Sequence, residues 1–136
     1  MEDNNKKKLY LITFLLDIGL IYLCTKKILP KFDIIWCYFT LFIHITFYYA
    51  LHKNNRPLLH KLHYLVFFIP MFSLFTKTIY PKILSLFLIM IIQFLWVIEN
   101  KCILNEEGET MGFDGITNIS IIVLNTLLSF QIGKLI

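Results

Sequence analysis

Four polar side chains stand inside long apolar stretches of this 136-residue chain, and their types could do chemistry: Asp17, His44, Gln93 and Asn125. A charged group at the centre of a membrane helix costs about 2.5 to 3.5 kcal/mol on insertion scales, so such a group needs a partner. Together the four side chains could line a path for protons or cations, or a pocket for a polar substrate. The alternative is a buried polar network that only fixes the register of the helices.

Asp17 and His44 are the best partners for each other, because each belongs to a stripe of polar residues at helical spacing. The first stripe comprises Tyr10, Thr13, Asp17 and Cys24, and the second comprises Cys37, Thr40, His44 and Tyr48. Two stripes that each carry a titratable group at similar depth should face each other. We therefore predict a contact between Asp17 and His44, with Gln93 and Asn125 as further hydrogen-bonding candidates.

The elements that must position these side chains are apolar runs about as long as a membrane crossing. Hydrophobic residues make up 57% of the chain, and the charges gather in short clusters between the runs. A soluble core could not bury that much apolar surface. At about 20 residues per crossing, five crossings would use roughly 100 residues and leave only short loops. The expected spans are residues 9–25, 32–51, 62–78, 82–98 and 116–132.

The expected fold is therefore an all-α helical integral membrane bundle of five transmembrane helices, with residues 1–136 forming a single polytopic membrane domain. Four helices are the fallback, because the last run carries Asn118, Asn125 and Ser129. In the first run, Asp17 favours a retained span over a cleaved signal peptide. Pro70 should kink the third helix, and Tyr80 and Pro81 should form the turn after it.

The charged clusters between the runs predict contacts with lipid rather than with nucleic acid. The net charge is +4, but lysine and arginine residues sit at the ends of the apolar runs, as expected for side chains that bind anionic head groups. Lys77 and Lys82 form one such group. The acidic segment 99–115 should be the one large loop outside the bilayer.

Motifs for catalysis and for metal or cofactor binding do not occur at the required spacings. Cys24, Cys37 and Cys102 show no metal-ligand spacing, and the first two are expected either as free thiols or as a disulfide. The histidines near residues 52–63 lack the repeated boxes of membrane di-iron enzymes, and residues 105–109 do not fit a calcium loop. The sequence therefore predicts no catalytic residue, no cofactor and no metal.

One loop resembles a known pattern. Its residues are Trp96, Glu99-Asn100, Cys102-Ile103-Leu104, Glu106 and Glu107. They resemble a loop with Trp, then Cys-x-Leu-Thr and a downstream Glu, found in small uncharacterised multi-span membrane proteins. Asn105 stands where that pattern has Thr. The resemblance implies a small helical membrane protein, and the bias toward codons of AT-rich genomes is consistent with a large DNA virus, a protist or a reduced bacterium as the source.

The sequence thus predicts a multi-pass integral membrane protein that is not an enzyme and serves as a structural or accessory component. Its expected partners are the lipid bilayer and either another membrane protein or further copies of itself. The alternative is a small proton or cation channel or transporter that uses Asp17 and His44.

Overall fold

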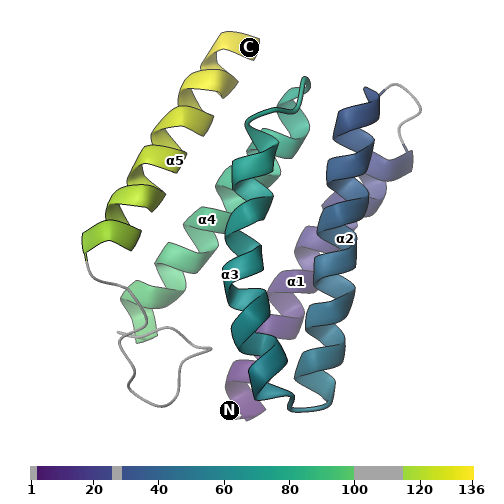
Figure 1. The fold of residues 1–136 in the computed structure, drawn as a ribbon, viewed down its shortest axis with the longest axis vertical. Coiled ribbons are helices and arrows are strands. Elements are labelled where there is room, and N and C mark those ends of the chain that lie inside the picture. The colour runs from purple at the N-terminus through teal and green to yellow at the C-terminus, as the bar shows by residue number, and fades with distance from the viewer. Residues whose placement is uncertain (1–2, 26–28, 100–114) are drawn as a thin grey trace.

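The secondary structure of the described part of the chain is helical throughout. A computed structural model describes residues 3–25, 29–99 and 115–136. Its helices are α1 (Asp3–Thr25), α2 (Lys31–His52), α3 (Arg56–Ser73), α4 (Ile79–Glu99) and α5 (Gly115–Leu135). Figure 1 shows α1 to α4 side by side as a bundle, with α5 at its edge. For the described residues, the all-α class and the presence of five helices are confirmed.

The α2–α3 connection explains why α3 begins six residues earlier than residue 62, where the third span was expected. Asn54 adopts a positive φ of 51°, a conformation that asparagine tolerates well. The Asn55 side chain then accepts a hydrogen bond from the backbone N–H of Leu58, at 3.2 Å. This is an N-cap, and Pro57 in the first turn is compatible with a helix start. The connection is thus confined to residues 53–55, and the polar residues from Arg56 to Lys61 are helical.

The α3–α4 turn also lies earlier than expected. α3 ends at Ser73, and the turn occupies residues 74–78 rather than Tyr80 and Pro81. Pro81 instead lies in the first turn of α4, where its missing N–H would have no partner within the helix. The prediction of a turn at Tyr80 and Pro81 was therefore wrong.

The helices pack around two apolar clusters. The larger cluster fills the space among α1 to α4 and includes Leu20, Ile43 and Ile69. The smaller one contains Ile89 of α4 with Ile121 and Leu128 of α5. α5 packs mainly on α4 and stands away from α1 and α2 in Figure 1. Most of the α5 surface is consequently uncovered.

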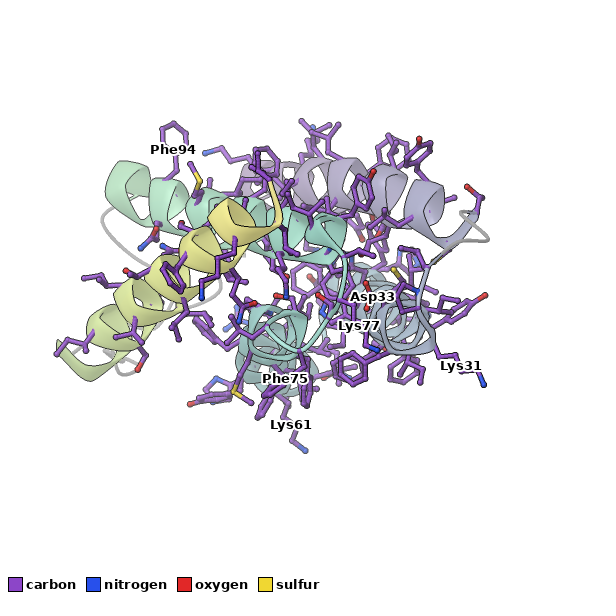
Figure 2. The ribbon with its side chains drawn as sticks, turned by 90° about the horizontal axis from the view of Figure 1, so that it is seen from above. Lys31, Asp33, Lys61, Phe75, Lys77 and Phe94 are labelled. Atoms are coloured by element: carbon purple, nitrogen blue, oxygen red, sulfur yellow. The ribbon has the colours of Figure 1, made fainter. Side chains whose placement is uncertain are left out.

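The distribution of side chains is inverted relative to a soluble protein. Large apolar side chains are exposed on every described helix, and Phe75 and Phe94 point outward in Figure 2. Asp17, Asp33 and Lys82 are buried at 9%, 0% and 3% exposure. In a water-soluble bundle, charged residues are almost never buried unless paired, and large contiguous apolar patches are rarely exposed.

Two described helical segments, Lys6–Thr25 and Lys31–His52, are long and apolar enough to cross a membrane. These segments favour membrane association only weakly, because a signal sequence or the core helix of a soluble protein can meet the same criterion. Only 22% and 39% of their apolar windows are buried, unlike a core helix. Shorter apolar segments occur at Ile79–Leu95 and Ile119–Leu135. Crossing of a bilayer by all five helices stays a prediction.

Candidate functional site

The first polar pair joins α1 to α2. His44 Nδ1 lies 2.6 Å from Asp17 Oδ1, and the two side chains are only 6% and 13% exposed. With the carboxylate ionised, the ring donates its Nδ1–H to Asp17. The predicted contact between these two residues is therefore present in the fold.

The remainder of the two polar stripes follows the same interface. The rings of Tyr10 and Tyr48 stack with centroids 5.7 Å apart and an interplanar angle of 11°. The hydroxyls of Thr13 and Thr40 donate to carbonyl oxygens of their own helices, at residues 9 and 36, each at 2.8 Å. The stripes thus face each other through Tyr10, Asp17, His44 and Tyr48, while the threonines are satisfied locally.

The second polar pair lies at a different interface. Asn125 Nδ2 of α5 donates a hydrogen bond to Gln93 Oε1 of α4 at 3.1 Å. Asn125 Oδ1 is buried and has no hydrogen-bond partner among the described residues. Within residues 3–25, 29–99 and 115–136, no hydrogen bond links this pair to Asp17 or His44. The four predicted residues therefore meet as two separate pairs and not as one path.

A small cavity of about 10 Å³ adjoins His44 inside the α1–α4 bundle. Thr40, Ser85 and Trp36 contribute to its walls, which are otherwise apolar. The Trp36 indole N–H is satisfied by the carbonyl oxygen of Ile69 at 2.8 Å, which ties α2 to α3. Ser85 Oγ is buried without a hydrogen-bond partner in the described part of the chain. The cavity is close to the smallest size that holds one water molecule.

On the other side of α1, Asp17 borders an open groove of about 480 Å³. Its walls are mostly apolar and aromatic, and they come from α1 and from the last two turns of α2. The lining residues are Tyr10, Leu11, Phe14, Asp17, Ile18, Ile21 and Tyr48. Asp17 therefore contacts His44 and also borders a space that a ligand could enter.

Asp33 is a buried carboxylate that the sequence analysis did not single out. Its Oδ1 accepts the backbone N–H of Lys77 at 2.9 Å. Its Oδ2 accepts the backbone N–H and the hydroxyl of Thr78 at 2.9 and 2.5 Å. Figure 2 shows Asp33 inside the bundle near Lys77, while Lys31 and Lys61 lie at the periphery. An acidic residue flanked by apolar ones, as in Phe32-Asp33-Ile34, is the signal that could have revealed it.

Lys82 corrects a second expectation. It was grouped with lysines that bind lipid head groups, but it is buried, and its Nζ donates to three carbonyl oxygens in the last residue of α3 and the turn that follows. The acceptors are Ser73, Leu74 and Thr76, at 2.9, 3.1 and 2.8 Å. An ammonium group here donates to carbonyls that have no partner within the helix. Its positive charge also interacts favourably with the negative end of the helix dipole.

No cluster of three or more His, Cys, Asp or Glu side chains that could hold a metal ion occurs among the residues that the structure describes. Cys24 and Cys37 are free thiols, as one of the two expectations had it. Residues 100–114, which contain most of the acidic loop together with Cys102, lie outside the described residues.

Comparisons of the chain with protein-family models, curated proteins and solved structures found no match.

Proposed function

We propose that this chain is a multi-pass helical membrane protein without enzymatic activity, which acts as a structural or accessory component of its membrane. Its buried polar pairs set how the helices pack, and its exposed apolar side chains meet lipid or neighbouring membrane proteins. The observation that carries this proposal is the combination of buried Asp17, Asp33 and Lys82 with exposed phenylalanine and other large apolar side chains on all five described helices.

The positions of the polar contacts support a packing role. The Asp17–His44 contact joins α1 to α2, and the Gln93–Asn125 bond joins α4 to α5. Asp33 joins α2 to the α3–α4 turn. Each polar contact therefore links two elements, and in an apolar solvent such contacts fix one register against others.

The same arrangement favours this role over a transport path lined by all four predicted residues. A path for protons or cations needs polar groups in sequence across the bundle, whereas one pair lies between α1 and α2 and the other between α4 and α5. Ser85 lines the same small cavity as His44, but no hydrogen bond between their side chains occurs among the described residues, and a serine nucleophile needs its base at hydrogen-bond distance.

Two measurements test the proposal on the full-length protein. Expressed in cells, the protein should remain with the membrane pellet after extraction at alkaline pH, because its apolar surface cannot be transferred to water. Reconstituted in liposomes, it should carry no proton or K⁺ flux above that of protein-free vesicles. Release into the supernatant would overturn the membrane assignment. A flux abolished by Asp17→Asn, with folding intact, would overturn the packing role in favour of transport.

A further inference from the structure

The groove bordered by Asp17 has the dimensions of a ligand site. It extends along α1 from Tyr10 to Ile21, which is about 16 Å at a rise of 1.5 Å per residue. Its volume of about 480 Å³ lies within the range of roughly 300 to 1,000 Å³ that is usual for small-molecule pockets. Tyr48 closes one side from α2.

Asp17 is the one carboxylate among the residues that line the groove. It is 9% exposed, and its Oδ1 is directed to His44. The Asp17 carboxylate stands next to an otherwise apolar and aromatic wall. The partners of this carboxylate inside the fold are the His44 ring and the Tyr48 hydroxyl, and a low local dielectric strengthens its attraction for a cation.

The other walls select what kind of cation could enter. Tyr10, Phe14 and Tyr48 offer aromatic rings, whose faces attract cations through the ring quadrupole. The Tyr10–Tyr48 stack holds two of these rings in fixed positions. The remaining lining residues are leucine and isoleucine, which favour alkyl or aromatic substituents over a hydration shell.

We propose that this groove binds a hydrophobic organic cation, such as a quaternary phosphonium or ammonium ion with bulky apolar substituents. Asp17 supplies the counter-charge, and Tyr10, Phe14 and Tyr48 supply the aromatic contacts. A bare metal ion is a poor fit because a single carboxylate offers too few hard ligands. A lipid chain would contact the apolar walls but make no use of the carboxylate. The inference goes beyond the proposed packing role, because it assigns a ligand to the outer side of the same residue.

The test is equilibrium dialysis of the purified full-length protein in detergent against tetraphenylphosphonium, with triphenylphosphine oxide as a neutral probe. Binding of the cation should be saturable at one site per chain and at least about tenfold tighter than that of the neutral probe, a difference that corresponds to 1.4 kcal/mol. Asp17→Asn should abolish this preference for the charged probe. Equal affinities for the two probes, or an unchanged affinity in folded Asp17→Asn, would overturn the proposal and indicate a groove for neutral chains.

A matched pair of surface variants keeps the test informative if Asp17→Asn does not fold. Phe14 lines the groove and is 58% exposed, whereas Phe42 is 68% exposed and lies outside it. Phe14→Ala should weaken phosphonium binding by about threefold or more, as expected for loss of one cation–π contact. Phe42→Ala should leave the affinity within about twofold. Equal effects of the two substitutions, or no effect of Phe14→Ala, would contradict a site in this groove.

Discussion

Asp33 and Lys82 bind opposite polar groups of the same turn. The Asp33 carboxylate accepts the N–H groups of Lys77 and Thr78, while the Lys82 ammonium donates to carbonyl oxygens of Ser73 and Thr76. The backbone between α3 and α4 is thus held by a buried anion on one side and a buried cation on the other. Such a turn can be buried without leaving these backbone groups unsatisfied.

Lys82→Met should strongly destabilise the protein. Methionine keeps the apolar stem but removes three hydrogen bonds to carbonyl oxygens and leaves the nearby carboxylate without its cation. We expect a loss of about 3 kcal/mol in the free energy of unfolding, measured by thermal or denaturant unfolding in detergent. Lys77→Met is the control, because the Lys77 side chain is exposed and only its backbone contacts Asp33. Equal losses in both variants would show that the Lys82 contacts add little.

The Asp17–His44 pair should respond asymmetrically to the loss of each partner. Asp17→Asn can keep a hydrogen bond to the ring and removes a buried charge, so the melting temperature should stay the same or rise. His44→Leu leaves the buried carboxylate with the Tyr48 hydroxyl as its remaining partner, which should cost up to about 3 kcal/mol. The double variant Asp17→Asn/His44→Leu should recover part of that loss, since no charge remains buried. A stable His44→Leu single variant would argue that the pair is not needed for folding.

Two buried serines of similar exposure should behave in opposite ways. Ser85 Oγ has no described partner, so Ser85→Ala removes an unsatisfied hydroxyl and should raise stability by up to about 1 kcal/mol. Ser73 Oγ donates to the carbonyl oxygen of Pro70 at 2.7 Å, and Ser73→Ala should lower stability by about 1 kcal/mol. Both values can be read from unfolding curves. A destabilising Ser85→Ala would indicate that the hydroxyl binds a water molecule in the adjacent cavity.

At Gly19, α1 packs directly against Leu84 of α4. A Cβ at Gly19 would lie 3.0 Å from Leu84 Cδ2, the end of a flexible side chain. Gly19→Ala should therefore be close to neutral, because the tighter contact offsets a gain of about 1 kcal/mol in helix propensity. Gly19→Leu should cost about 1 to 3 kcal/mol through overpacking. Gly133→Leu is the control, since nothing lies within 4 Å of its Cβ position, and a comparable loss there would exclude the packing explanation.

The contact between α1 and α2 could be predicted because it depends only on the residue pattern of each helix and on the two helices being neighbours in sequence. Both Asp17 and His44 stand at mid-helix in a polar stripe, and the short connection between the helices makes them antiparallel neighbours. Spacing alone then brings the two stripes together. Gln93 and Asn125 could be named as hydrogen-bonding residues for the same reason, but their separation from the first pair depends on the placement of α5, which no sequence pattern specified.

The buried turn could not be predicted because its partners are brought together only by the tertiary fold. Asp33 lies 44 residues before Lys77, and an acidic residue in the first turn of a helix is usually explained by the helix dipole alone. Lys82 follows a proline at the edge of an apolar run, where a lysine ordinarily faces the head groups. Burial of both residues depends on α3 ending at Ser73. The turn was expected at Tyr80 and Pro81, whereas it occupies residues 74–78.

The Asp17–His44 contact also bears on biosynthesis. The carboxylate leaves the ribosome 27 residues ahead of the imidazole that accompanies it, so α1 is made before its partner exists. The apolar side chains of α1 offset the cost of burying that charge only narrowly, at about 0.3 to 0.6 kcal/mol each. Under the proposed membrane role, α1 and α2 should therefore enter a bilayer together as a helical hairpin, only after His44 has been synthesised.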